Sequence, residues 1–153
     1  MARLLIVHHT ASPALHSLFE AVLSGAGDPQ LSGAGLEVCS RPALGATPSD
    51  ALAADGYILG TPANLGSMAG ALKHFFDTVY YPCLDITAGR PFGLYVHGNN
   101  DTAGAINDIT KIITGLRWRQ CTATVSVLGQ PDRGALDACW NLGATVGAHI
   151  VAG

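Results

Sequence analysis

Short apolar runs alternate with helix-like segments five times along this chain. The runs lie at residues 3–7, 36–40, 57–59, 91–96 and 117–128. A short, continuous apolar run is typical of a strand that is buried on both faces. Strands that alternate with helices form a parallel sheet through right-handed crossovers, so helices cover both of its faces. The sequence therefore predicts an α/β fold, a three-layer, doubly wound domain around a five-stranded parallel sheet.

Three of the expected helices have recognisable starts. Ser12 precedes Pro13 in the order typical of an N-cap followed by the first helical residue. Pro48-Ser49-Asp50 and Pro131-Asp132 begin two more helices in the same way. The other two are expected over Ser67–Val79 and Ala105–Leu116, where apolar residues recur at helical spacing.

The connections between these elements are expected to lie on the surface. Gly25–Gly35 is rich in glycine, and Tyr80–Arg90 contains Pro82 and Gly89, so both are predicted to be irregular. Loops are also expected after the first, third and fourth strands, and these read His8–Leu15, Gly60–Gly66 and His97–Gly104.

Size and charge narrow the possibilities. A length of 153 residues fits one domain over residues 1–153. Apolar residues make up 48% of the chain and charged residues 12%, which supplies a core and argues against disorder. The low charge also favours self-association, so a homodimer is the expected oligomer. The net charge is −3 and the basic residues are scattered, which argues against a nucleic-acid partner.

Localisation and metal binding follow from short-range patterns. The apolar run before His8 is far too short for a signal peptide or a membrane span, so we expect a cytoplasmic protein with no membrane partner. The cysteines are far apart without a C-x-x-C pair, which favours buried, reduced thiols at Cys39, Cys83, Cys121 and Cys139. Adjacent His8 and His9 point to opposite sides of a strand end, so no metal site is expected.

The loop after the first strand carries the clearest chemistry. In doubly wound sheets the ligand sits at the carboxyl ends of the strands, where the strand order reverses. Here that place holds hydroxyls and backbone donors at a helix start: Thr10, Ser12 and the N–H groups of Ala11, Ala14 and Leu15. A helix N-terminus of this kind suits a phosphate dianion. Ordinary helix capping by Ser12 accounts for the same loop equally well.

Larger nucleotides are disfavoured by the absence of their motifs. A triphosphate site would show G-x-x-x-x-G-K-[ST], and the chain has no such run. The two glycine pairs Gly25/Gly27 and Gly33/Gly35 lack the third glycine of a dinucleotide fingerprint, and both follow a helix instead of a strand. A monophosphate nucleotide, held by hydroxyls and amides without lysine or arginine, is what remains.

Three segments resemble the flavodoxin-like family. LLIVHHTASPALHSLFEAV is similar to its phosphate loop, and RPFGLYVHGNNDTAGA is similar to its third loop. DGYILGTPANLGSMAGALKHFFDTV resembles the second FMN loop of the flavodoxin-like NAD(P)H:quinone oxidoreductases and FMN reductases, through Gly60-Thr61-Pro62, the G-x-M-A-G start at Gly66 and the pair Phe76-Asp77. The resemblance implies a flavodoxin-like sheet with strand order 2-1-3-4-5 and FMN as the cofactor.

The same resemblance implies which residues bind FMN. The phosphate would be held by the first loop, at His9, Thr10, Ala11, Ser12, Ala14 and Leu15. The second loop would lie along the isoalloxazine, at Thr61, Pro62, Ala63, Asn64, Leu65 and Gly66. The third would flank its other edge, at His97, Gly98, Asn99 and Asn100. The first loop departs from the family pattern at Pro13, which has no N–H to donate. Cys83 is expected to be buried and not at the flavin edge.

The resemblance leaves two functions open. Electron-carrier flavodoxins are typically strongly acidic and enclose the flavin between aromatic side chains, whereas this chain has a small net charge and no aromatic residue in its second loop. An uncovered flavin face allows a nicotinamide or quinone to stack for hydride transfer. We therefore expect an FMN-dependent oxidoreductase that uses NADH or NADPH and a quinone or other small-molecule electron acceptor. An electron carrier, or a binding module without turnover, is the alternative. No side chain is predicted to be catalytic.

Overall fold

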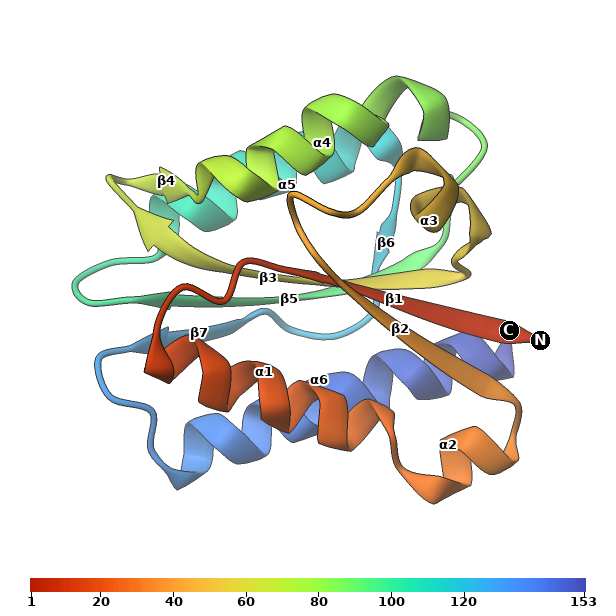
Figure 1. Cartoon of the computed structure of the whole chain (residues 1–153), viewed down its shortest axis with the longest axis horizontal. Helices are drawn as coiled ribbons and strands as arrows, with labels where there is room; N and C mark the ends of the chain where they lie inside the picture. Colours follow the sequence, from red (N-terminus) through yellow and green to blue (C-terminus); the bar gives the residue numbers. More distant parts are fainter.

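A parallel sheet runs through the middle of the protein (Figure 1). The computed structural model describes all 153 residues. Its parallel strands are β1 (Ala2–His8), β2 (Leu36–Pro42), β3 (Gly56–Asn64), β5 (Pro91–Gly98), β6 (Arg119–Gln120) and β7 (Val125–Leu128). The order is β2-β1-β3-β5-β6, and β7 also pairs with β5. The predicted order 2-1-3-4-5 is confirmed, because β5 is the fourth main strand and β6 and β7 together occupy the fifth position.

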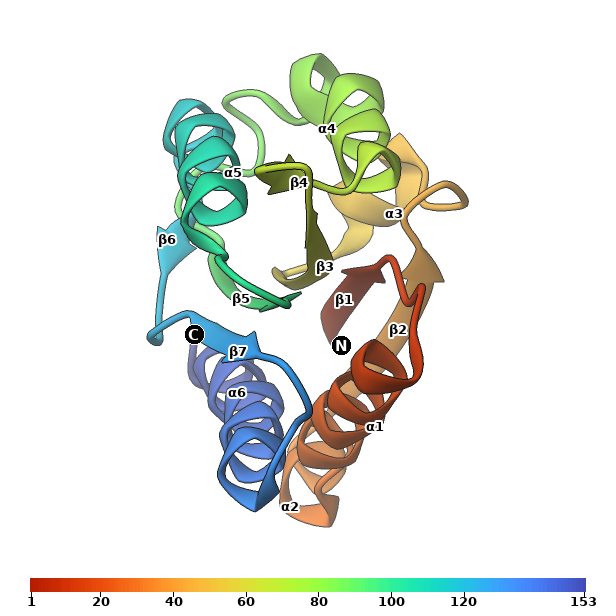
Figure 2. The same ribbon diagram turned by 90° about the vertical axis from the view of Figure 1, so that its left-hand side faces the viewer.

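Helices cover both faces of the sheet (Figure 2). One face carries α1 (Pro13–Ala26), α2 (Pro29–Gly33) and α6 (Arg133–Ala152). The other face carries α3 (Pro48–Ala53), α4 (Gly70–Cys83) and α5 (Ala103–Leu116). A core cluster of 15 buried residues lies under the first set of helices and one of 22 under the second, so the three predicted layers are confirmed. None of these helices has both the length and the apolar character needed to cross a bilayer.

The region after the third strand differs from the prediction. β3 continues to Asn64 and forms an antiparallel hairpin with β4 (Ser67–Met68), so 60–64 is strand and α4 begins only at Gly70. Asn64 pairs with Ser67, which leaves a two-residue turn in which Leu65 and Gly66 both have positive φ. Turns of this kind match the twist of paired strands. β5 likewise extends through His97 and Gly98, because His97 pairs with the lengthened β3 and Gly98 pairs with β7.

Two expected loops contain helix, and one expected strand is broken. α2 interrupts Gly25–Gly35, because Asp28 caps it and the buried Leu31 anchors it. α4 runs through Pro82, since the buried side chains of Val79 and Cys83 hold its last turn in the core. The fifth strand consists of β6 and β7, and residues 121–124 between them are not strand, although the N–H of Cys121 still donates to the carbonyl oxygen of Phe92.

The four cysteines are free thiols, as predicted. Cys83 and Cys139 are buried, whereas Cys39 and Cys121 are only partly covered. Burial raises the pKa of the Cys83 and Cys121 thiols and raises that of Cys139 to about 12, which keeps these groups protonated and unreactive at neutral pH. Cys83 ends α4 at the end of the sheet remote from the strands' carboxyl ends, so it is not near the predicted ligand site.

Two glycines let α1 and α6 approach closely, and this contact fixes the position of α1. A Cβ on Gly143 of α6 would overlap the carbonyl oxygen of Val22 in α1. A Cβ on Gly25 of α1 would overlap the carbonyl oxygen of Trp140 in α6. Because both obstacles are backbone atoms, neither can move aside without shifting a helix.

Replacing Gly143 by alanine should therefore destabilise the protein. We expect Gly143→Ala to lower the free energy of unfolding by about 2–3 kcal/mol, the range of overpacked cores, as measured by chemical denaturation. Gly134→Ala is the control within the same helix, because its Cβ would meet nothing closer than Asp132 Oδ1 at 3.4 Å. That variant should be neutral or more stable by up to about 1 kcal/mol. Equal losses in both variants would contradict the proposed helix contact.

Candidate functional site

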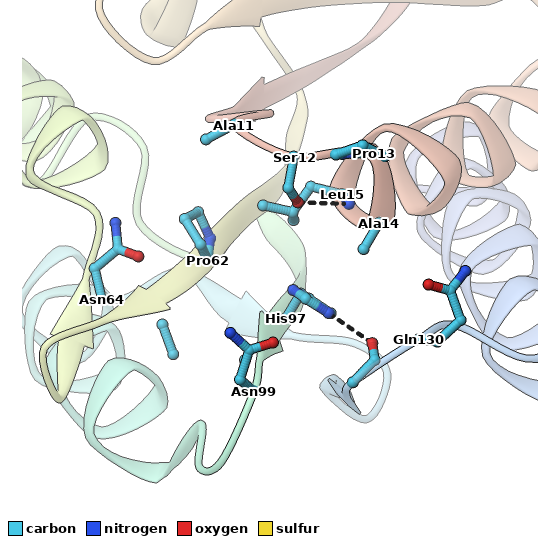
Figure 3. A pocket seen from close by; sticks show the side chains of 13 residues that line it. Ala11, Ser12, Pro13, Ala14, Leu15, Pro62, Asn64, His97, Asn99 and Gln130 are labelled. Carbon is cyan, nitrogen blue, oxygen red and sulfur yellow. Dashed lines mark hydrogen bonds between the residues drawn. The ribbon is translucent and has the colours of Figure 1, made fainter.

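A pocket of about 470 Å³ opens at the carboxyl ends of the central strands (Figure 3). This is the edge of the sheet at which the sequence predicted a ligand, and the volume lies within the range of small-molecule sites. Four segments form the walls: the start of α1, the end of β3, the end of β5 with its loop, and the loop after β7. The lining residues are Ala11, Ser12, Pro13, Ala14, Leu15, Pro62, Ala63, Asn64, His97, Gly98, Asn99, Gly129 and Gln130.

Most of the predicted site residues meet in this pocket. Those that line it are Ala11, Ser12, Ala14, Leu15, Pro62, Ala63, Asn64, His97, Gly98 and Asn99. Six others do not line it, namely His9, Thr10, Thr61, Leu65, Gly66 and Asn100. The contribution of each of the sixteen to ligand binding stays a prediction.

Internal hydrogen bonds explain why two of the predicted hydroxyls do not line the pocket. The Oγ1 atom of Thr10 lies 2.7 Å from Nδ1 of His8. Thr61 is fully buried, and its hydroxyl accepts from the N–H of Ala69 at 3.0 Å and donates to the carbonyl oxygen of Pro62 at 2.8 Å. These threonines hold the loops in shape.

Sequence reasoning missed the fourth wall of the pocket. Gly129 and Gln130 follow β7, whose carboxyl end lies at the same edge of the sheet as those of β1, β3 and β5. The rule that selected the other loops also applies to the fifth strand. The signal was therefore present in Leu128-Gly129-Gln130-Pro131, where the predicted strand ends in a turn.

The start of α1 supplies the donors of the pocket. Ser12 caps the helix, since its Oγ accepts from the N–H of Leu15 at 3.2 Å, as predicted. The N–H groups of Ala11, Ser12 and Ala14 have no acceptor within the chain, and Pro13 has no N–H. The Ser12 hydroxyl proton is also free, because the cap uses only the oxygen as acceptor. Together with the positive end of the helix dipole, these donors favour an anion.

The hairpin that follows the second wall is held against α5. The Ser67 hydroxyl donates to Asp108 Oδ2 at 2.6 Å. Gly104 lies directly against Gly66, because a Cβ on Gly104 would overlap the Gly66 carbonyl oxygen. At the tip, Leu65 is fully exposed and has φ of 51°, a conformation that costs about 1–2 kcal/mol in a non-glycine residue.

His97 joins the third wall to the fourth. Its side chain is 9% exposed, and Nε2 donates to the carbonyl oxygen of Gly129 at 2.8 Å. The N–H of Gly129 donates in turn to the carbonyl oxygen of Gly98 at 2.9 Å. Because a carbonyl oxygen can only accept, the Gly129 contact places a proton on Nε2 and orients the ring. The other ring nitrogen, Nδ1, is directed toward the pocket (Figure 3).

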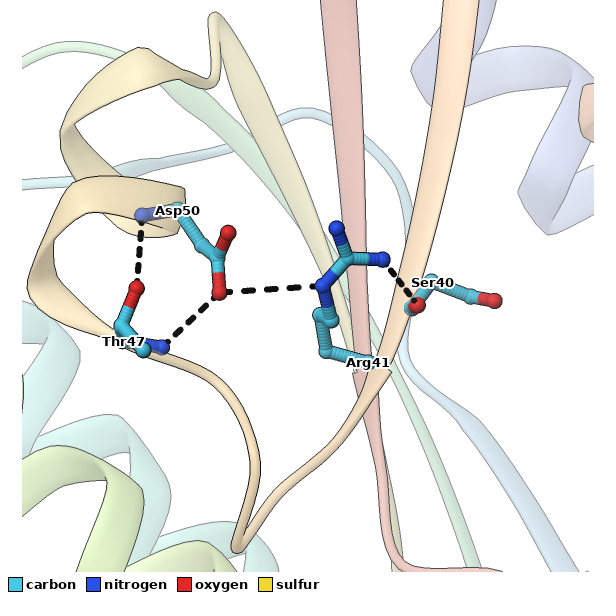
Figure 4. Close-up of polar contacts among 4 residues, drawn as sticks. All are labelled: Ser40, Arg41, Thr47 and Asp50. Atoms are coloured by element: carbon cyan, nitrogen blue, oxygen red, sulfur yellow. Dashed lines mark hydrogen bonds and ion pairs between the residues drawn. The ribbon is translucent and has the colours of Figure 1, made fainter.

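The lining has little charge. His97 is the only titratable side chain among the lining residues, and no lysine or arginine is present. Arg41, at the carboxyl end of β2, is engaged elsewhere: its guanidinium donates to the carbonyl oxygen of Ser40 at 3.0 Å and lies 3.8 Å from Asp50, which forms a capping box with Thr47 (Figure 4). At the end of β1, burial and the neighbouring His9 lower the pKa of His8, which favours its neutral form.

No three histidine, cysteine, aspartate or glutamate side chains gather at a position that could hold a metal ion. His74 and His149 are exposed. What the pocket can do chemically is bind an anionic group at α1 and present amide side chains to the rest of the ligand, at Asn64, Asn99 and Gln130.

Comparison with known proteins points to one family. Residues 34–130 match the family model described as NADPH-dependent FMN reductase. Among solved structures, a flavodoxin from the domain Archaea has 14% identity and a TM-score of 0.80, and the match covers 97% of this chain and 98% of that one. A flavodoxin, WrbA-like protein from Agrobacterium tumefaciens has 18% identity and a TM-score of 0.77, with 98% of both chains covered. At such identities the structural likeness shows the fold alone. No curated protein sequence matches the chain.

The strain at the hairpin tip can be tested on its own. Asn-Gly is the preferred pair for a two-residue turn with positive φ, and an exposed Leu65 loses no burial when it is replaced. We expect Leu65→Asn to raise the free energy of unfolding by about 0.5–1 kcal/mol in chemical denaturation. Leu44→Asn is the control, because Leu44 is also exposed but does not have positive φ. A similar gain from both substitutions would attribute the effect to reduced surface hydrophobicity instead.

Proposed function

The chain belongs to the NADPH-dependent FMN reductase family, and we propose that it binds FMN in the pocket at the carboxyl end of its sheet. We propose further that the flavin takes reducing equivalents from NADH or NADPH and delivers them to a quinone or another small acceptor. One observation carries this proposal: the unpartnered N–H groups at the start of α1 open into a pocket whose lining contains no phenylalanine, tyrosine or tryptophan.

The donor set at α1 fits a phosphate monoester. Ala11, Ser12 and Ala14 offer backbone N–H groups, and Ser12 adds a hydroxyl proton. Helix α1 is 14 residues long, so a full helix dipole contributes at this end. A nucleotide with one phosphate suits the cradle better than one with several, because no lysine or arginine lines it to balance further charge.

The opposite part of the pocket fits an uncharged, planar ring system. Pro62 and Ala63 present apolar surface, while the amide side chains of Asn64, Asn99 and Gln130 each offer both a donor and an acceptor. Such a mixture suits a heterocycle whose edge alternates between carbonyl oxygens and ring nitrogens. FMN, when bound, supplies two-electron redox chemistry, and these residues bind and orient it.

The lack of aromatic cover favours turnover over electron carriage. Hydride transfer requires the donor and the acceptor carbon atoms to come into van der Waals contact, so one face of the ring system must be open to a second molecule. Pro62, Ala63 and Asn64 are too small to enclose a ring face, and Leu65 extends into solvent at the hairpin tip. The chain's own contribution is therefore to hold one substrate and leave room for the next.

The test is the reduction of the bound flavin by nicotinamide nucleotides. The protein is loaded with FMN, mixed anaerobically with NADPH or NADH, and followed by the loss of flavin absorbance in a stopped-flow instrument. We expect bleaching by at least one of the nucleotides, and we expect Leu65→Trp, whose larger aromatic side chain can fold back from the hairpin tip over the ring, to slow it about tenfold or more while FMN stays bound. If neither nucleotide bleaches the flavin but a protein donor reduces it, the electron-carrier function is correct.

Ser12 tests the position of the phosphate. Ser12→Ala removes the N-cap and one donor, so we expect it to lower the free energy of unfolding by about 1 kcal/mol and to weaken FMN more than riboflavin. Binding of each flavin is measured by the quenching of its fluorescence. Ser17→Ala is the matched control, because Ser17 lies on the same helix and its hydroxyl donates only to the carbonyl oxygen of Pro13. Equal weakening of both flavins by Ser12→Ala would place the phosphate elsewhere.

A further inference from the structure

The pocket combines an anion-favouring helix end with a single titratable side chain. All donors at the start of α1 are neutral, namely N–H groups and one hydroxyl. A phosphate dianion held only by neutral donors keeps an uncompensated charge in a partly enclosed site, which is unfavourable. His97 is the one lining residue that can become a cation.

The register of β5 directs His97 toward α1. Successive side chains of a strand point to opposite faces, so residues two apart share a face. Tyr95 lies in the core cluster between the sheet and helices α1 and α6, together with Leu15 of α1. His97, two residues further along β5, therefore projects on the α1 side of the sheet, beyond the point where β1 ends at His8. Figure 3 shows its imidazole in the same pocket as Ser12 and Leu15.

Because of the hydrogen bond to Gly129, only one ring nitrogen of His97 can gain or lose a proton. Nε2 carries a proton in either charge state, because it donates to the Gly129 carbonyl oxygen. Nδ1 has no hydrogen-bond partner in the chain and is directed toward the pocket. Neutral His97 therefore presents a lone pair to the pocket, and protonated His97 presents an N–H donor with a positive charge.

We propose that His97 is the cationic partner of the phosphate group, and that Nδ1 takes up a proton from solvent when a phosphate monoester binds. The proton balance is as follows: the ligand enters as the dianion and one proton moves from solvent to Nδ1. The bound pair of phosphate and imidazolium therefore has a net charge of −1 instead of −2. This proposal rests on the proposed function, and it assigns His97 to the phosphate instead of the ring edge that the family resemblance implied. It makes His97 a determinant of selectivity for phosphorylated flavin over riboflavin.

Other charged groups near this end of the sheet do not replace His97. On β1 and α1, burial keeps His8 neutral, His9 lies outside the lining, and His16 is exposed beside Glu20. In the loop after β5 and at the start of α6, Asp101 and Asp132 cap backbone N–H groups. Arg133 is exposed and lies 3.5 Å from Asp137. None of these side chains lines the pocket, so His97 is the titratable group that a bound phosphate meets.

The proposal predicts that the affinity for FMN depends on pH and that the affinity for riboflavin does not. The apoprotein is titrated with FMN and with riboflavin at several pH values between 6.5 and 8.5, and the dissociation constants are measured by fluorescence quenching. We expect the Kd of FMN to rise about tenfold across this range, because proton uptake that accompanies binding becomes less favourable as the pH rises, and that of riboflavin to stay constant. The phosphate's own second ionisation, near pH 6, acts in the opposite sense by supplying more dianion as the pH rises.

Two variants isolate the imidazole. In His97→Gln the amide N–H can still donate to the Gly129 carbonyl oxygen, but no charge can form, so FMN should bind about tenfold more weakly at pH 6.5 and its Kd should no longer rise with pH. Riboflavin should bind this variant as it binds the native protein. His149→Gln is the control, because His149 is exposed and lies outside the pocket. It should behave as the native protein does.

Proton uptake can be measured without any variant. Calorimetric titration of the native protein with FMN, in two buffers of different ionisation enthalpy near pH 7.5, should show uptake of a fraction of a proton with FMN and none with riboflavin. If His97→Gln keeps the native pH profile, or riboflavin shows the same proton uptake, the role of His97 is wrong although FMN binding stands. If neither flavin binds the native protein at any pH, the proposed function fails as well.

Discussion

Parallel pairing of β1, β3 and β5 is the constraint on which the site depends. β1 ends at His8 beside Gly60, whereas β3 and β5 continue until Pro62 lies beside His97. The sheet therefore has a step at its carboxyl edge. After β1 ends, the chain turns and begins α1 at the same edge of the sheet, so the helix start faces the ends of the two longer strands. A pocket arises because the strands differ in length, and not because any segment is flexible.

Close packing keeps α1 in that position. Gly25 and Gly143 allow α1 and α6 to touch through backbone atoms, and the two helices lie on the same face of the sheet (Figure 2). Both helices follow a strand and begin at the carboxyl edge, so the contact also sets the loop Gly129–Gln130 against the start of α1. The free N–H groups of α1 thus lie across the pocket from the loop Gly129–Gln130, which is held in place by its hydrogen bond to His97. A neutral cradle can bind an anion only if its donors are held in place, because it has no net charge to attract one at a distance.

The hairpin between β3 and α4 shows local strain held by tertiary contacts. Leu65 adopts a left-handed conformation with its side chain in solvent, and nothing in the turn itself favours leucine there. The bond from Ser67 to Asp108 and the contact of Gly66 with Gly104 bind the hairpin to α5. These contacts offset the strain of the left-handed conformation, which persists only because the surrounding structure holds it.

The sequence by itself determined the layer architecture, the start of α1 and the three loops that line most of the pocket. These follow from patterns within a few residues: an apolar run, a Ser-Pro helix start, and polar residues where a strand ends. Only the tertiary structure decided that β3 extends to Asn64 and that α4 begins at Gly70 and passes through Pro82. The reason is that a strand's length depends on hydrogen bonds to its neighbour, and a helix end on what its last side chains are buried against. Neither partner is visible in the local sequence.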